Sequence, residues 1–316
     1  MKIGVLAVDG KQPNYALMKV SKWYKAQGAE VEFYSPFGHF DKVYMSKIFT
    51  FSPDYLQIMD NVDEVEKGGT GYDVKSQLPK VIDDCEPDYD LYGLPADYAL
   101  GFLTRGCRNK CKWCVVPIKE GAITPYRDIE EVTQGTRTKV TLMDNNILAC
   151  DYGLGQLEKI AKLGIRVDFN QGMEARLIDV ETAKLLSSVK WLGSIRLACD
   201  THSAIQPLRE AVVRLRAAGY KGEICCYTLI NSDIKETLTR INEVKNIDPK
   251  LTPYAQPYRD FVKNTEPPKW QQDMARWVNR RELFRTTSFE QYEPRKGFRC
   301  SEYFKTEKST LCKEDD

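Results

Sequence analysis

From residue 101 onward, stretches patterned as buried β-strands alternate regularly with stretches of helical spacing. The strand patterns fall at 101–105, 139–144, 165–171, 194–200, 223–230 and 250–256. The helical patterns between them fall at about 127–134, 154–163, 179–188, 203–218 and 233–246. This order predicts an α/β fold with parallel strands, because parallel neighbours need a crossover that is usually a helix. Six such repeats predict a partial (β/α)6 barrel, with chemistry at the carboxyl ends of its strands.

A smaller α/β module precedes this series. It has a helical pattern at 14–28 that ends at Gly28, a typical C-cap residue. Strand patterns lie on both sides of that helix, at 2–8, 30–35 and 41–51. Strand–helix–strand order implies parallel pairing and therefore a Rossmann-like or flavodoxin-like layer.

The acidic segment 52–98 is rich in glycine and proline and is predicted to be an irregular connection. It places a domain boundary near residue 98. We therefore expect an N-terminal module at 1–98, a barrel at 99–260, and a C-terminal helix and tail at 261–316.

Composition limits the class of protein. The 316-residue chain is 42% hydrophobic and 29% charged, as ordinary soluble globular proteins are. No apolar run approaches the roughly 20 residues of a membrane-spanning helix, and the start reads as a strand rather than a secretory signal. We expect a cytoplasmic protein with no membrane contact. Its ten cysteines would then serve as ligands, nucleophiles or core side chains rather than disulfides.

Three of these cysteines, Cys107, Cys111 and Cys114, crowd into one short loop directly after the first strand of the series. Polar and basic neighbours argue against their burial as small hydrophobic side chains. Structural zinc needs four ligands, usually in two pairs, and the chain has only two histidines and no second C-x₂-C. A cubic iron–sulfur cluster normally takes four thiolates. Three thiolates would leave one iron open to an exogenous ligand.

The segment GCRNKCKWC resembles the CxxxCxΦC signature of the radical S-adenosylmethionine (radical SAM) superfamily, with Trp113 at the aromatic position. The resemblance covers about residues 100–256. It implies a 4Fe–4S cluster on Cys107, Cys111 and Cys114, with S-adenosylmethionine as cofactor or co-substrate. It also implies an enzyme whose reductive cleavage of this ligand yields a 5′-deoxyadenosyl radical that abstracts hydrogen from a substrate. A small electron-donor protein such as flavodoxin or ferredoxin would be its partner.

The resemblance further implies ligand contacts at the strand ends. Where the family often has a GGE-like stretch, this chain has Asp144, Asn145 and Asn146, which offer acceptors for the ligand's amino group. Arg196 suits the ligand's carboxylate because a guanidinium fork matches it. The other candidates follow the third strand or lie on the fifth, and they are Gln171, Glu174, Arg176 and Thr228. Barrel packing or loop hydrogen bonding is the alternative role for each of them.

A Rossmann-like module ahead of such a barrel resembles the cobalamin-binding subgroup, many members of which transfer methyl groups. The common motif D-x-H-x-x-G supplies a histidine to cobalt, but here Asp9 and Gly10 stand without one. His39 lies after the second strand, outside the motif. We expect a degenerate module that has lost cobalamin. A cobalamin-dependent methyltransferase remains an alternative.

Another alternative comes from residues 269–299, where basic and aromatic residues alternate. Such a stretch can bind nucleic acid by phosphate pairing and stacking, which would suit a non-catalytic iron–sulfur or zinc protein. The plainer interpretation is an amphipathic helix at about 270–284 and a tail that packs its aromatic side chains on the core. The net charge of +1 gives no general preference for a polyanion.

Three further patterns carry less chemistry. The glycine-rich stretch GGTGYD at 68–73 lacks the lysine–serine ending of a P-loop. Cys225 and Cys226 are adjacent in a predicted strand, where successive side chains point to opposite faces, so joint ligation is not expected. Cys300 and Cys312 are too few for an auxiliary cluster.

Overall fold

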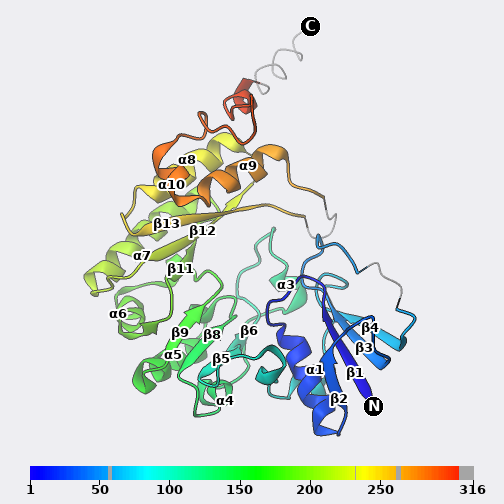
Figure 1. Cartoon of the computed structure of the whole chain (residues 1–316). Coiled ribbons are helices and arrows are strands. Elements are labelled where there is room, and N and C mark those ends of the chain that lie inside the picture. Colours follow the sequence, from blue (N-terminus) through cyan, green and yellow to red (C-terminus); the bar gives the residue numbers. More distant parts are fainter. Residues whose placement is uncertain (56–58, 232, 261–264, 306–316) are drawn as a thin grey trace. The chain divides into compact units, whose positions relative to one another are not determined.

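The computed structural model describes residues 1–55, 59–231, 233–260 and 265–305. Cys312 lies outside the described residues. The chain has an α/β architecture with parallel strands and divides into two compact units (Figure 1). The first contains Met1–Met143, and the second contains Asp144–Asp260 with the described part of Thr265–Asp316.

The first unit contains the predicted N-terminal sheet. Its four strands run parallel in the order β2-β1-β3-β4, with Ile3 paired to Val31 on one side and to Lys42 on the other. The strands are β1 (Lys2–Ala7), β2 (Glu30–Phe33), β3 (Phe40–Ser46) and β4 (Val62–Gly68). Helix α1 (Tyr15–Ala26) begins where Asn14 Oδ1 accepts a hydrogen bond from the N–H of Leu17, as an N-cap should. The parallel pairing predicted for this module is therefore confirmed.

Both faces of this sheet carry apolar side chains. Ile3, Val5 and Tyr44 pack with Leu17 and Val20 of α1. Phe40, Val43 and Met45 form a separate buried cluster. A parallel sheet buried on both faces is the arrangement that near-continuous apolar strands require.

The prediction that 52–98 is only an irregular connection was wrong. The segment contains β4, a short helix α2 (Lys80–Asp83) and a 3₁₀ turn η1 (Tyr89–Tyr92). Lys42 on β3 pairs with Glu64 at 2.9 Å and with Glu66 at 2.7 Å on the neighbouring β4. These ion pairs between neighbouring strands stabilise β4 in the sheet. Its acidic composition made β4 resemble a loop in the sequence.

The remainder of the first unit frames the cysteine segment. β5 (Tyr98–Gly101) pairs in parallel with β8 (Lys139–Leu142). The strand predicted at 101–105 is divided, because β6 (Thr104–Arg105) turns away and pairs antiparallel with β7 (Thr124–Pro125). Two short helices, α3 (Val116–Lys119) and α4 (Ile129–Thr133), complete the unit. The cysteines thus lie in the connection between β6 and β7.

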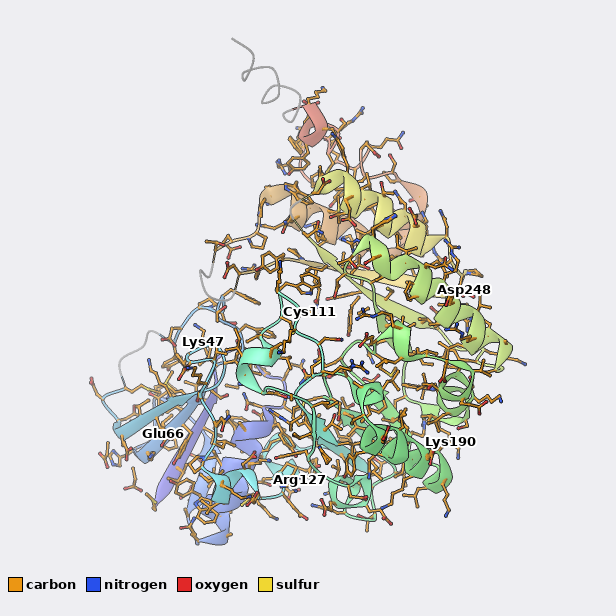
Figure 2. The ribbon with its side chains drawn as sticks, turned by 180° about the vertical axis from the view of Figure 1, so that it is seen from behind. Lys47, Glu66, Cys111, Arg127, Lys190 and Asp248 are labelled. Atoms are coloured by element: carbon orange, nitrogen blue, oxygen red, sulfur yellow. The ribbon has the colours of Figure 1, made fainter. Side chains whose placement is uncertain are left out.

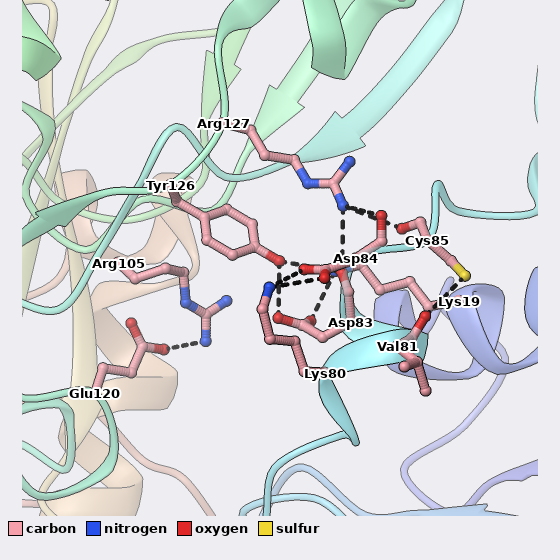
Figure 3. Close-up of polar contacts among 10 residues, drawn as sticks. All are labelled: Lys19, Lys80, Val81, Asp83, Asp84, Cys85, Arg105, Glu120, Tyr126 and Arg127. Atoms are coloured by element: carbon pink, nitrogen blue, oxygen red, sulfur yellow. Dashed lines mark hydrogen bonds and ion pairs between the residues drawn. The ribbon is translucent and has the colours of Figure 1, made fainter.

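A polar network joins residues on both sides of the boundary expected near residue 98 (Figure 3). Lys19 Nζ in α1 donates hydrogen bonds to Asp83 Oδ1 at 2.7 Å and to the hydroxyl of Tyr126 at 2.8 Å. Arg127 donates to the main-chain carbonyl of Asp84 at 2.8 Å. The compact unit therefore extends past residue 98 to Met143. The functional division into 1–98, 99–260 and 261–316 stays a prediction.

The second unit alternates strands and helices as predicted. β9 (Arg166–Phe169) pairs in parallel with β10 (Lys190–Trp191), and a parallel sheet has the order β11-β12-β13. Those strands are β11 (Ile195–Ala198), β12 (Ile224–Ile230) and β13 (Leu251–Pro257). The main helices are α5 (Asp151–Leu163), α6 (Val180–Ser188), α7 (Ile205–Ala217) and α8 (Ile234–Lys245). Parallel pairing is confirmed, and closure into a partial barrel stays a prediction.

The helix predicted at 270–284 is two helices, α9 (Lys269–Val278) and α10 (Arg281–Thr286). Asn279 interrupts them because its side-chain amide exchanges two hydrogen bonds, of 2.8 and 2.9 Å, with the main chain of Ala255 on β13. Four aromatic side chains of the 269–299 stretch are buried, namely Trp277, Phe284, Phe289 and Tyr292. This burial supports core packing and removes these four rings from any stacking surface.

Within the described ranges, every helix is too short or too polar to cross a bilayer.

Candidate functional site

The cysteine loop is clamped at its base. The N–H of Gly106 donates to Glu120 Oε2 at 2.8 Å, and Arg105 pairs with Glu120 Oε1 at 2.7 Å. The N–H of Cys107 donates to the carbonyl of Gly121 at 3.1 Å. Since the Glu120 carboxylate is largely buried, these charge-assisted contacts hold the two ends of the loop together firmly.

Gly106 is required by this close approach. It has a φ of +80°, and a Cβ at this position would overlap the carbonyl oxygen of Ala122. Only glycine adopts this backbone region without cost, and only glycine leaves room for the carbonyl of Ala122. The backbone of the loop therefore requires a glycine directly before Cys107.

The thiols are partly buried and receive backbone hydrogen bonds. Cys107 Sγ accepts from the N–H of Asn109 at 3.4 Å, and Cys114 Sγ accepts from the N–H of Val116 at 3.5 Å. Cys111 and Trp113 are also half-buried, and Cys111 is labelled in Figure 2 on the segment that precedes α3.

The spacing of the three thiols differs from that of a one-ion site. Within the described part of the chain, His39, Asp41 and Asp63 form a group whose possible metal-ligand atoms all lie within 4.8 Å of one another. The three loop cysteines do not form such a group. Sulfurs around one tetrahedral zinc would be about 3.8 Å apart, given a Zn–S bond of roughly 2.3 Å. At least two of the loop sulfurs are therefore farther apart than the ligands of a single zinc ion.

In the second unit, Arg196 on β11 lies in a polar cluster. Arg196 Nη1 donates to Asp168 Oδ1 on β9 and to the carbonyl of Phe169 at 2.9 Å. Burial opposes the charge on Arg196, but the hydrogen bond and charge of Asp168 outweigh burial and raise its pKa. The guanidinium is therefore a permanent cation beside the strand ends.

The stretch after β9 runs beside the same cluster. The N–H of Met173 donates to the carbonyl of Arg196 at 2.8 Å, and the hydroxyl of Tyr227 donates to the carbonyl of Asn170 at 2.9 Å. Sequence reasoning missed Asp168 and Tyr227. Strand alternation could have indicated Tyr227. Arg196 pairs in register with Cys225, and Tyr227 lies two residues further along the same strand, on the same face of the sheet as Cys225.

Thr228 lies on the opposite face of β12. It is fully buried with Cys226 and Ile230, and Ile230 packs in the core with residues of α8 and α9. The structure therefore does not bring Thr228 together with Arg196. Cys225 is half-buried whereas Cys226 is fully buried, which confirms that these adjacent thiols face opposite sides.

A second polar group follows β8 and β9. Asn146 Nδ2 donates to Glu174 Oε2 at 2.9 Å, and Glu174 Oε1 pairs with Arg176 at 2.5 Å. Asn146 Oδ1 is buried and has no hydrogen-bond partner within the described ranges. An unsatisfied buried acceptor is costly and marks a position where a ligand donor would be stabilised.

The remaining predicted contacts are placed differently. Asp144 is buried and Asn145 is half-buried, next to Asn146 in the chain. Gln171 is exposed, and its side-chain amide donates to Asn170 Oδ1 at 3.3 Å. Of the polar strand-end candidates, the structure thus brings together Asn146, Glu174 and Arg176.

The strand ends of the N-terminal sheet are tied by Asp9. Its carboxylate accepts hydrogen bonds from the N–H groups of Ile48 and Phe49 and, at 2.5 Å, from the hydroxyl of Ser52. Asp9 follows β1, and residues 48–52 follow β3. The contact therefore lies between the carboxyl ends of β1 and β3, where the strand order reverses and where such sheets bind ligands. The Nε2 atom of His39 instead lies 3.3 Å from Asp63 Oδ2.

Neither the protein-family models nor the curated proteins with which the chain was compared gave a match.

Proposed function

We propose that this chain is a radical SAM enzyme whose 4Fe–4S cluster is held by Cys107, Cys111 and Cys114. When bound, the cluster supplies the electron for cleavage of S-adenosylmethionine to methionine and a 5′-deoxyadenosyl radical, which removes hydrogen from a substrate. One observation carries the proposal. A clamped loop presents three half-buried thiols, two of which accept backbone hydrogen bonds at sulfur, and the three sulfurs do not all lie within 4.8 Å of one another.

The finer fold belongs to the same proposal. The parallel strands β5, β8, β9, β11, β12 and β13 would form the wall of a partial barrel, with the cysteine loop following the first of them. The regular β–α order supports this arrangement.

The donor and acceptor groups of the second unit suit the two polar ends of the methionyl group. Asn146 Oδ1, an unsatisfied acceptor, and the carboxylate of Glu174 would accept hydrogen bonds from its ammonium. Arg196 would pair with its carboxylate through guanidinium N–H groups not used on Asp168 and Phe169. These residues bind and orient the ligand. None of them is assigned a role in hydrogen abstraction.

The test is anaerobic reconstitution with iron and sulfide, followed by reduction and measurement of 5′-deoxyadenosine. The wild-type chain should bind about four irons and form the nucleoside, and Cys107→Ala should lose both. Cys85→Ala is the matched control, because this thiol lies outside the loop and donates to the carbonyl of Val81. Unchanged iron content in Cys107→Ala would refute the proposal.

Two measurements separate the alternatives. Retention of corrinoid after incubation with hydroxocobalamin would favour the cobalamin-dependent methyltransferase, which the Asp9 contact at the strand ends does not favour. About one zinc and no iron per chain would favour the non-catalytic metal protein.

A further inference from the structure

His39, Asp41 and Asp63 lie together at the amino ends of two neighbouring strands. His39 directly precedes β3, Asp41 is the second residue of β3, and Asp63 is the second residue of β4. The strands β3 and β4 are parallel neighbours in the sheet of the first unit (Figure 1). Their register places Asp41 opposite Asp63, so both carboxylates project from the same side of the sheet.

The atoms of these three side chains that could bind a metal converge on one place. All three lie within 4.8 Å of one another, and His39 Nε2 lies 3.3 Å from Asp63 Oδ2. Donor atoms around a tetrahedral zinc ion are about 3.3–3.4 Å apart, given bonds of roughly 2.0–2.1 Å. The distance between the His39 and Asp63 atoms therefore matches one edge of such a site. A small rotation of the Asp41 side chain would supply a third corner.

The two aspartates carry like charges that lack a compensating lysine or arginine. Carboxylates directly opposite on neighbouring strands repel each other. Within the described ranges, Asp63 pairs with His39, and Asp41 accepts a hydrogen bond from the main-chain N–H of Lys2 at 2.5 Å. The ammonium groups of Lys2 and Lys42 pair with glutamates instead. A divalent cation between the two carboxylates would remove their repulsion.

The turn that carries His39 is fixed to the start of β4. Asn61 Nδ2 donates to the carbonyl of Gly38, and the N–H of Phe40 donates to the carbonyl of Asn61 at 2.9 Å. These bonds involve the residues on both sides of His39 and hold its backbone beside that of Asp63. Binding of a metal would therefore order three side chains and no backbone, which keeps its entropic cost low.

We propose that His39, Asp41 and Asp63 bind one zinc ion, with water completing its coordination. An imidazole nitrogen and carboxylate oxygens are usual ligands of zinc, whereas magnesium and calcium prefer oxygen ligands alone. The site lies at the amino ends of the strands, at the opposite edge of the sheet from the contact of Asp9. It contains no cysteine and does not depend on the proposed function.

The histidines of the chain allow a direct test. The chain has two, His39 and His202, and both are exposed, so His202 is an internal control. The experiment is a titration of the metal-free full chain with zinc, followed by ¹H–¹⁵N spectra of the imidazole groups, which His39→Asn assigns. The His39 signals should shift as zinc binds, and those of His202 should not. Zinc bound at the loop cysteines leaves this readout unaffected. Unchanged His39 signals, or equal shifts at both histidines, would overturn the proposal.

Two variants test the carboxylate ligands. Asp41→Asn and Asp63→Asn should each weaken the zinc affinity measured from the His39 shift by about tenfold or more, because each removes a charged ligand. Glu64→Gln is the matched control, since Glu64 follows Asp63 in the chain but pairs with Lys42. Unchanged affinity in both aspartate variants, or equal weakening in Glu64→Gln, would show that these carboxylates are not the ligands.

Melting temperatures separate a ligand role from a structural one. Without metal, Asp41→Asn should melt at the same temperature as the wild type or higher, because asparagine keeps an acceptor for the N–H of Lys2 and removes one of two like charges. Zinc should raise the melting temperature of the wild type more than that of Asp41→Asn. A lower melting temperature of metal-free Asp41→Asn, or an equal rise with zinc, would contradict a metal site.

Discussion

Gly106 donates its backbone N–H to Glu120 Oε2 across 2.8 Å, and this bond connects the residue before the first cysteine to the helix end that follows the last. The same carboxylate pairs with Arg105. The loop that presents the thiols is therefore closed by contacts that involve no metal.

This closure predicts that Gly106→Ala is far more harmful than Gly121→Ala. Both glycines have positive φ, +80° and +74°, but a Cβ on Gly121 meets open space whereas one on Gly106 meets the carbonyl of Ala122. Gly121→Ala should cost about 1–2 kcal/mol of unfolding free energy, the ordinary cost of a left-handed alanine. Gly106→Ala should cost more and also reduce the iron bound after reconstitution. Urea unfolding and iron analysis measure both, and equal effects of the two substitutions would contradict the clamp.

The ion pair in the network of Figure 3 predicts a pH-dependent contribution to stability. Burial disfavours the Asp83 carboxylate, but hydrogen bonds from Lys19 and Tyr126 and the charge of Lys19 outweigh burial and lower its pKa. Burial dominates for Lys19 and lowers its pKa despite Asp83. The carboxylate therefore stabilises the fold above the unfolded pKa of about 3.9, and this contribution is lost as pH falls through the folded pKa.

Asp83→Asn should accordingly destabilise the chain at pH 7 and leave buried Lys19 without its charged partner. We expect a loss of about 1–2 kcal/mol, below the range for fully buried pairs because the Asp83 side chain is 44% exposed. The difference from wild type should shrink in acid, and adding Lys19→Met should recover part of the loss. A difference that does not depend on pH between 3 and 7 (roughly the window of carboxylate titration) would rule out this ion pair as its source.

The two faces of β12 predict opposite outcomes for two site candidates. Arg196→Lys should weaken binding of S-adenosylmethionine about tenfold, because lysine lacks the guanidinium fork. Thr228→Val should leave binding unchanged, since Thr228 is buried on the face that packs with Ile230. Equilibrium dialysis with the reconstituted chain measures both. Weakened binding in Thr228→Val alone would restore the sequence-based expectation and count against Arg196.

Much of the fold was readable in the sequence because apolar periodicity and caps act locally. Helix α1 and the strands of the second unit follow this logic. β4 was missed because its side chains are mostly exposed and acidic, and Lys42 on the neighbouring strand supplies the compensating charge. The break between α9 and α10 was missed because Asn279 pairs with Ala255, a contact distant in sequence.

The candidate site was likewise predictable only in part from the sequence. The spacing of Cys107, Cys111 and Cys114 is local and visible in the sequence, and so is the polar run that contains Asn146. Which face of β12 turns towards Arg196 depends on helix packing, and both faces carry a cysteine and a hydroxyl-bearing residue. Sequence reasoning therefore chose Thr228 where the structure places Tyr227 beside Asn170.

Electron paramagnetic resonance of the reduced, reconstituted chain, with and without S-adenosylmethionine, tests whether Cys107, Cys111 and Cys114 hold a cluster that binds this ligand. We expect the signal of a reduced 4Fe–4S cluster that changes on addition of the ligand, and no such signal in Cys107→Ala. A chain that binds no cluster, or a cluster whose signal is the same with and without S-adenosylmethionine, would contradict it.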